Sequence, residues 1–192
     1  MPYSIAATIL VPLIRVVRER FPEIQLKVFQ EPSITLPDHI LSGRLDIGVI
    51  VTPGNVGGLR HLPLVQEELL FVSTPQILKG FNKEISLVDI SDLPLILPTR
   101  ANSLRILIDS FFLLQSLPMN VVHEVEAISH FIGCVEAGVA STFLPAGCLG
   151  NSLKNHAIDV RSLVGRPLSR NVTLACSQSR PMGNAERHVE AQ

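Results

Sequence analysis

Apolar residues recur with two different periods along the first part of the chain. Over residues 4–20 they return every three to four positions, which is typical of an amphipathic helix, and Ser4 is expected to cap its start. Pro12 is expected to kink this helix or to delay its start, because proline removes a backbone donor. Later apolar runs alternate or are continuous, as in strands. The expected elements are a helix over 4–20, a strand over 24–30, a helix over 34–42 ended by Gly43, and a strand over 45–51.

The rest of the chain continues to alternate strands with helices. This order predicts an α/β protein with a mostly parallel sheet and right-handed crossovers. Residues 1–51 and 95–145 repeat one order of elements, so we expect two α/β lobes with a cleft between them. The remaining expected strands cover 67–73, 95–98, 119–125, 140–145, 158–161 and 171–177, and helices are expected within 85–94, 99–116, 127–138 and 146–155.

Composition narrows the class of protein. With 192 residues, of which 46% are hydrophobic and 17% charged, the chain can bury a core. Its net charge is −1, it has no basic block and it lacks Trp, so nothing in it predicts a nucleic-acid surface. Pro12 and Arg15 interrupt the apolar start, which favours a helix over a signal peptide, and no apolar run reaches the roughly 20 residues that span a bilayer. The three cysteines lack a C-x-x-C spacing and indicate buried thiols in a reducing compartment.

Signatures of catalysis and metal binding are scarce. The sequence contains no G-x-S-x-G, no phosphate-binding loop and no H-E-x-x-H. His123 and His130 are separated by an expected strand-to-helix break and have no third ligand nearby, so we expect no metal and no cofactor. Glu124 and Glu126 alternate on one expected strand. Two carboxylates can perform acid–base chemistry, but the favoured interpretation is structural, with Glu126 leading into the next helix.

Small polar residues gather where helices are expected to begin. They occur at Tyr3-Ser4, within 98–103 and at 127–129, and Thr52 ends the strand over 45–51. In open α/β sheets, ligands bind beyond the carboxyl ends of strands, and the N–H groups that open helices favour anions. For each residue alone, an ordinary cap is the favoured interpretation. The set as a whole favours a site, because both halves of the chain present the same arrangement. The residues that could converge on a small polar ligand are Ser4, Thr52, Thr99, Arg100, Asn102 and Ser103.

Five segments in sequence order resemble the effector-binding domain of LysR-type transcriptional regulators. They are LVPLIRVVRERFPEIQLKV, LSGRLDIGVIV, LPLVQEELLFVSTP, DLPLILP and VVHEVEAISHFIGCVEAGVASTFLP. Together they span most of the chain, and their order makes the resemblance specific. The TRANSLR loop is similar to the branch of this family that controls nitrogen and sulfur assimilation.

The resemblance implies a fold and a site. The fold would be α/β, with two Rossmann-like subdomains and a cleft between them, as in type 2 periplasmic binding proteins. Subdomain I would comprise 1–72 and 177–192, and subdomain II 73–176. The effector-binding residues implied by position are Tyr3, Ser4, Ile5, Thr52, Thr99, Arg100, Asn102, Ser103, Ala127 and Ile128.

The resemblance also implies a function that this chain would perform only in part. The family's winged helix-turn-helix is absent from the sequence, so we expect a piece of a longer protein. A small polar or anionic metabolite would bind between the lobes and control DNA binding by that missing domain. We expect a cytoplasmic homodimer or homotetramer with no membrane contact and no enzymatic activity. Val11, Ile14 and Val17 are candidate dimer residues, and the alternative that they belong to the core is equally open. Three alternatives remain: a transporter's solute-binding protein, a bilobal enzyme, and a domain that only oligomerises.

Overall fold

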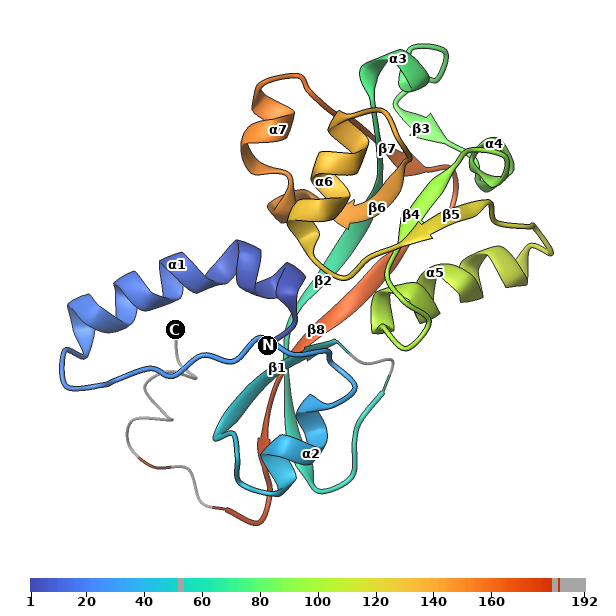
Figure 1. The fold of residues 1–192 in the computed structure, drawn as a ribbon. Helices are drawn as coiled ribbons and strands as arrows, with labels where there is room; N and C mark the ends of the chain where they lie inside the picture. The colour runs from blue at the N-terminus through green and yellow to red at the C-terminus, as the bar shows by residue number, and fades with distance from the viewer. Residues whose placement is uncertain (52–53, 181–182, 184–192) are drawn as a thin grey trace. The chain divides into compact units, whose positions relative to one another are not determined.

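Two compact units make up the chain. In the computed structural model (Figure 1), the residues described are 1–51, 54–180 and 183. Unit 1 comprises Met1–Gln66 and Asn171–Gln192, and unit 2 comprises Glu67–Arg170. Both boundaries fall inside strands, β2 (Leu59–Ser73) and β8 (Ser169–Ser177). The chain therefore passes from one unit to the other twice, each time as an extended strand.

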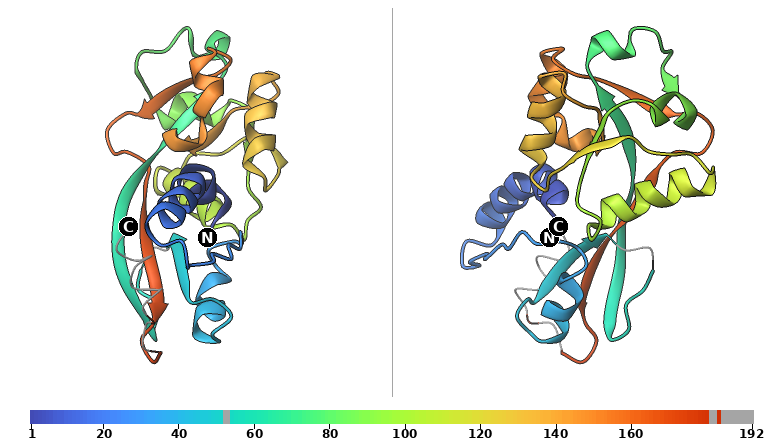
Figure 2. Two further views of the ribbon diagram at one scale, coloured as in Figure 1. Left: turned by 90° about the vertical axis from the view of Figure 1, so that its left-hand side faces the viewer. Right: turned by 45° about the vertical axis from the view of Figure 1, so that its right-hand side comes forward.

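Unit 1 is built around three neighbouring strands. Here β1 (Ile47–Val51) pairs antiparallel with β8, and β8 lies between β1 and β2. The short helix α2 (Leu36–Leu41) lies alongside β1, as Figure 2 shows. Gly48 permits this close approach, because a Cβ there would lie 2.6 Å from Cδ1 of Ile40. The core between α2 and the strands consists of Leu36, Ile40, Ile50, Leu59 and Ala175.

The first helix, α1 (Tyr3–Arg20), differs from expectation at its start. Pro2 occupies the N-cap position, and its carbonyl accepts the first helical bond from the Ala6 amide at 3.0 Å. The expected cap Ser4 is therefore wrong: it lies inside the helix and is 6% exposed. Proline is suited to this place because its φ is already near helical values and no helical bond uses its nitrogen. Pro12 lies within the continuous helix.

The strand expected over 24–30 is also wrong. This segment has no strand structure, although the backbone at its end contacts Met1 twice. The Phe29 carbonyl accepts a bond from the Met1 amino group at 2.8 Å, and the Glu31 amide donates to the Met1 carbonyl at 3.2 Å. Two bonds to one residue do not form a ladder, since a strand needs several consecutive partners. The alternating sequence pattern predicted a strand, but among the described residues this segment has no neighbouring strand to pair with.

Unit 2 combines antiparallel and parallel pairing, so the expectation of a mostly parallel sheet is wrong. Strand β2 pairs antiparallel with both β6 and β7, whereas β3 is parallel to β7 and β4 is parallel to β5. The antiparallel pairs arise on β2, the long strand that enters from unit 1. The elements within this unit are α3 (Pro75–Leu78), β3 (Glu84–Ile85), α4 (Leu87–Ser91), β4 (Leu95–Leu97), α5 (Ser103–Leu114), β5 (Val121–Glu124), α6 (Ile128–Glu136), β6 (Thr142–Pro145), η1 (Ala146–Cys148), α7 (Gly150–Lys154) and β7 (Asp159–Leu163).

Strand β4 separates two apolar clusters of unit 2. Its side chains alternate, so Leu95 and Leu97 join one cluster and Ile96 joins the other. Helix α5 contributes Ile108 and Phe112 to the first cluster, and α6 contributes Phe131 and Val135 to the second. The short strand is fully covered on both faces, which fixes the position of the loop that follows it.

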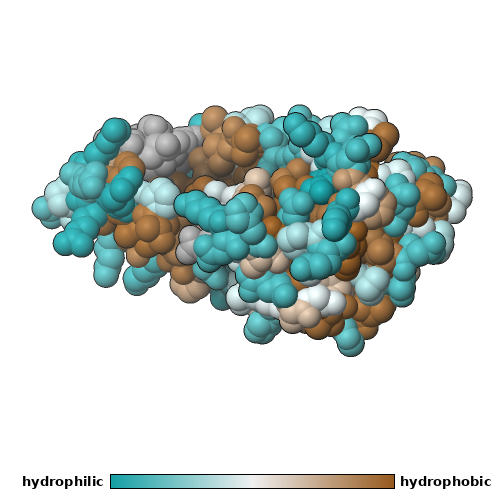
Figure 3. Space-filling view, turned by 90° about the horizontal axis from the view of Figure 1, so that it is seen from above, coloured by the Kyte–Doolittle hydropathy of each residue, from teal (hydrophilic) through white to brown (hydrophobic). Residues whose placement is uncertain are grey.

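The surface remains partly apolar. Figure 3 shows hydrophobic side chains interspersed with hydrophilic ones on one face. On α1, Val11 is 77% exposed and Ile14 is 47% exposed, but Val17 is 2% exposed and belongs to the interior. Val17 is therefore wrong as a candidate dimer residue. Of the helices in the described part of the chain, none is long and apolar enough to cross a membrane.

Candidate functional site

The loop after β4 prepares the start of α5. The Asn102 amide donates to the Thr99 carbonyl at 3.0 Å and closes a turn. Asn102 then occupies the N-cap position, where its side-chain oxygen accepts a bond from the Leu104 amide at 3.0 Å. This is the usual role of Asn at a helix start, because its oxygen satisfies an amide that has no helical partner. The side-chain nitrogen of Asn102 remains available for another contact.

The end of β5 lies beside this loop. Strands β4 and β5 are parallel neighbours, with Leu97 opposite Glu124, and the Val125 amide donates to the Leu97 carbonyl at 3.0 Å. Parallel neighbours place their carboxyl ends at one edge of a sheet, where α/β proteins bind ligands. Glu126 follows directly, and Ala127 then occupies the N-cap position of α6 without a capping side chain.

The carboxylate of Glu126 accepts hydrogen bonds from Thr99 and Asn102 in the loop between β4 and α5. Its Oε1 accepts a bond from the Thr99 amide at 3.0 Å and another from the Thr99 hydroxyl at 2.5 Å. Its Oε2 accepts a bond from the side-chain amide of Asn102 at 3.0 Å. The two loops that open α5 and α6 are therefore joined by one side chain that belongs to neither helix.

Two opposing effects act on the pKa of Glu126. Burial raises it, but the bonds from the Thr99 hydroxyl, the Thr99 amide and Asn102 lower it more, so the pKa lies below its ordinary value of 4.5. The carboxylate is consequently ionised throughout the neutral range. Its charge is held by neutral donors rather than by a cation.

We refer to Thr99, Asn102 and Glu126, with the loops that carry them, as the corner. A buried arginine stabilises this corner from the interior. The Arg105 side chain is 4% exposed, and its guanidinium contacts Asp109 and Glu124, each at 2.7 Å. It also donates to the Pro98 carbonyl at 3.0 Å. Burial lowers the pKa of Arg105, but its hydrogen bonds and the two carboxylates raise it overall. Arg105 therefore ties the end of β4 to α5 and β5 beneath the loop.

The structure brings some predicted site residues together and separates others. In unit 2, Thr99 and Asn102 meet through Glu126, Ser103 and Ile128 begin α5 and α6, Ala127 precedes α6, and Arg100 is exposed in the loop. In unit 1, Tyr3 is 40% exposed, whereas Ser4 is buried and Ile5 packs in a core with Val49 and Val172. Thr52 lies outside the described residues.

The sequence interpretation missed the roles of Glu126 and Arg105. Glu126 was expected only to lead into a helix, although it is the common partner of Thr99 and Asn102. A usable signal was its position immediately after a strand expected to end beside the Thr99 loop. Arg105 carried no such signal, because its position in an amphipathic helix is equally typical of a solvated side chain.

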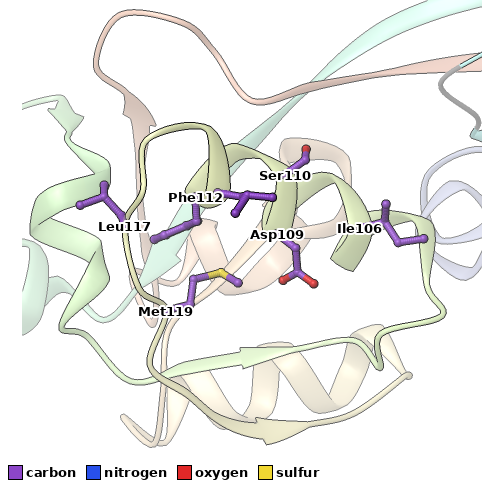
Figure 4. Close-up of a pocket in the computed structure, with 7 residues that line it drawn as sticks. Ile106, Asp109, Ser110, Phe112, Leu117 and Met119 are labelled. Atoms are coloured by element: carbon purple, nitrogen blue, oxygen red, sulfur yellow. The ribbon is translucent and has the colours of Figure 1, made fainter.

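A separate open pocket lies along α5. It has a volume of about 460 Å³ and is shown in Figure 4. None of the predicted site residues lines it. Asp109 and Ser110 are its polar lining residues, and the others are apolar: Ile106, Phe112, Leu113, Leu117 and Met119. Among the described residues, no group of three His, Cys, Asp or Glu side chains could hold a metal ion.

Solved structures with this fold include effector-binding domains. The effector-binding domain of QuiR in complex with shikimate is 21% identical, has a TM-score of 0.84, and is matched over 98% of this chain and 90% of that chain. The CcmR regulatory domain of Synechocystis PCC6803 in complex with 2-PG is 12% identical, with a TM-score of 0.88 and the same coverage. These likenesses establish the α/β fold of type 2 periplasmic binding proteins that was expected from the sequence.

Sequence relatives are transcriptional regulators. The nitrogen assimilation regulatory protein nac of Klebsiella aerogenes is 27% identical over 144 residues, which are 75% of this chain and 46% of that protein. The regulator BbuR of Bordetella bronchiseptica is 26% identical over 170 residues, 88% of this chain and 52% of that protein. The chain thus spans about half the length of these relatives. The family model described as LysR substrate binding domain matches residues 1–191, and the chain belongs to this family.

Proposed function

We propose that this chain is the effector-sensing part of a LysR-type transcriptional regulator and that it binds a small polar metabolite. The observation that carries the proposal is the convergence of Thr99, Asn102 and Glu126 at the carboxyl ends of two parallel strands. Ligands of α/β proteins bind at this edge. Family membership supports a sensory role, and shikimate in QuiR and 2-PG in CcmR show that small molecules bind structural neighbours.

The proposed site extends beyond these three residues. On unit 2 it includes Arg100, Ser103, Ala127 and Ile128, which flank the hydrogen-bonded corner. Tyr3, Ser4, Ile5 and Thr52 of unit 1 stay predictions from sequence position. Ligand binding would favour one conformation of the domain, and the size of that shift would equal the difference in the ligand's affinity for the two conformations.

In the whole protein, this shift would alter DNA binding by a helix-turn-helix domain. We propose that the protein acts in the cytoplasm as a homodimer or homotetramer, with Val11 and Ile14 of α1 as candidate contacts because both are exposed. The relatives are regulators, which supports this function over a transporter's solute-binding protein or an enzyme.

Native mass spectrometry of the gently purified 192-residue chain tests the proposal. We expect a retained small molecule that is absent after denaturation and that raises the melting temperature when added back. Ser103→Ala, which removes a hydroxyl at the start of α5 without touching the cap, is expected to weaken this thermal shift. Repeated failure of retained and screened metabolites to bind would contradict the sensory function.

A further inference from the structure

We propose that Glu126 determines ligand specificity: its carboxylate occupies the donors of Thr99 and Asn102, and so disfavours anionic effectors at this corner. The inference rests on the proposed function, because it concerns the same site. It narrows the ligand class from polar or anionic metabolites to neutral or cationic ones that present hydrogen-bond donors.

The donors at this corner are already committed to an anion. The Thr99 amide and hydroxyl each have one hydrogen, and both point to Oε1 of Glu126, at 3.0 and 2.5 Å. The side-chain amide of Asn102 reaches Oε2 at 3.0 Å, while its oxygen is used by the Leu104 amide. The side-chain nitrogen of Asn102 has two hydrogens, and one of them is not used by Glu126. A ligand carboxylate, sulfate or phosphate could obtain the two Thr99 hydrogens and the other Asn102 hydrogen only by displacing Glu126.

The charges around the corner add to this selection. The buried cation Arg105 is shared by Asp109 and Glu124, at 2.7 Å each, and by the Pro98 carbonyl. With Glu126, the corner thus holds three carboxylates and one buried guanidinium. Arg100 is exposed in the same loop, makes no ion pair with the described residues and adds a second positive charge. Three carboxylates against two guanidinium groups still leave one net negative charge, and the buried guanidinium of Arg105 is already paired.

The same arrangement suits a ligand that donates hydrogen bonds. A carboxylate has about four lone-pair positions, and Glu126 uses two on Oε1 and one on Oε2. Glu126 is solvent-exposed, so a ligand can reach the remaining position on Oε2. A hydroxyl or an ammonium group of the ligand would donate a hydrogen bond to this position. The bonds from Thr99 and Asn102 to Glu126 would stay in place. The ligand class that fits is therefore a polyol, a sugar or an amine.

Titration of the uniformly ¹⁵N-labelled 192-residue chain with sodium sulfate tests the inference, with the Thr99 amide as the reporter. Sodium chloride at equal ionic strength provides the baseline. In the unmodified chain the Thr99 resonance is expected to respond equally to both salts. In Glu126→Ala the three donors become available, and sulfate is expected to bind at least about tenfold more tightly, which corresponds to roughly 1.4 kcal/mol.

Two further variants separate donor release from a change in net charge. Glu136→Ala removes an exposed carboxylate from the other end of α6 and is expected to leave sulfate affinity unchanged. Thr99→Val in the Glu126→Ala background is expected to lose most of the gained affinity, because the hydroxyl is absent. Glu126→Gln, which keeps the size of the side chain, is expected to give an intermediate affinity even if Glu126→Ala folds poorly.

The inference is overturned if sulfate binds the unmodified chain at Thr99 as tightly as it binds Glu126→Ala, or if Glu136→Ala produces the same gain. Both readouts use an inorganic anion and do not require the natural effector. A chain that binds neither retained nor screened metabolites but shows the Glu126→Ala gain would contradict the sensory function alone. A retained anionic metabolite that shifts the Thr99 amide of the unmodified chain would contradict the specificity role alone.

Discussion

Thr99 donates twice to one oxygen of Glu126, from its amide at 3.0 Å and from its hydroxyl at 2.5 Å. The two residues lie 27 positions apart, one after β4 and the other after β5. Their contact joins the loops that open α5 and α6 and determines which donors a ligand can find. The stability of this corner and of the packing around it can be measured residue by residue.

Glu126 is expected to make stability depend on pH. Its folded pKa lies below the ordinary value of 4.5, so the carboxylate contributes stability that is present above the unfolded pKa and is lost as pH falls through the folded pKa. Glu126→Gln should therefore lower the free energy of unfolding at pH 7 by about 1 kcal/mol, a value kept small because the side chain is exposed.

The measurement is urea denaturation of both chains at pH 7 and at progressively lower pH. The difference between the two should shrink as the pH falls below the ordinary value and vanish once Glu126 is protonated. A difference that stays constant across this range would mean that the charge of Glu126 is not what stabilises the corner.

Arg105 is expected to be a large contributor to the stability of unit 2. Arg105→Met keeps much of the packing but leaves the Pro98 carbonyl, Asp109 and Glu124 without their partner. Because the two carboxylates remain 38% and 41% exposed, we expect a loss of about 2–3 kcal/mol, less than for a fully buried pair. Lys at this position cannot reproduce the planar fork and should recover only part of the loss.

Urea denaturation measures this effect, with Arg100→Met as the matched control. Arg100 is exposed, so its replacement should change stability by no more than about 0.5 kcal/mol. Equal effects of the two substitutions would show that the Arg105 network is not a specific source of stability.

Asn102 is expected to have two separable roles. Asn102→Ala removes the cap of α5 and should cost about 1 kcal/mol. Asn102→Ser restores a capping oxygen and should recover most of this stability. Both variants lack the side-chain amide of Asn102 that donates to Glu126. Both should therefore raise the pKa of the Glu126 carboxyl above its value in the unmodified chain.

Thermal unfolding and the ¹³C titration of the Glu126 carboxyl measure the two roles independently. If Ser restores the pKa along with the stability, the amide contact of Asn102 contributes nothing to the charge state of Glu126.

Gly48 and Ile40 are expected to be energetically coupled. A Cβ at Gly48 would lie 2.6 Å from Cδ1 of Ile40, whose side chain is 1% exposed. Gly48→Ala should therefore cost about 1–3 kcal/mol. Ile40→Val removes that Cδ1 methyl group and should itself cost about 0.5–1.5 kcal/mol. Since the shortened side chain leaves room for the Cβ added by Gly48→Ala, the double variant should lose less stability than the sum of the two.

A double-mutant cycle by urea denaturation measures the coupling. Gly80→Ala is the control, because a Cβ there would meet nothing within 4 Å. Additive effects of the two substitutions would show that the cost of Gly48→Ala does not come from a clash with Cδ1 of Ile40.

The sequence by itself determined the elements whose signals are local. The helices over Ser103–Leu114 and Ile128–Glu136 and the strand over Ile47–Val51 were expected from periodicity and helix-start residues. A helix within 85–94 was also expected, and its N-cap Ser86 forms a capping box with Asp89. These features depend on residues three or four positions apart, so a linear pattern carries them.

Only the tertiary structure decided which segments became neighbours. The stretch 24–30 has the alternation of a strand but lacks a ladder partner, while β2 extends through Leu59–Gln66 where the pattern predicted no strand. The contacts of Glu126 with Thr99 and Asn102 depend on the parallel pairing of β4 with β5. Strand pairing and the hydrogen bonds to Glu126 join residues that lie far apart in the chain. These contacts stabilise the fold only when packing has brought those residues within hydrogen-bond distance.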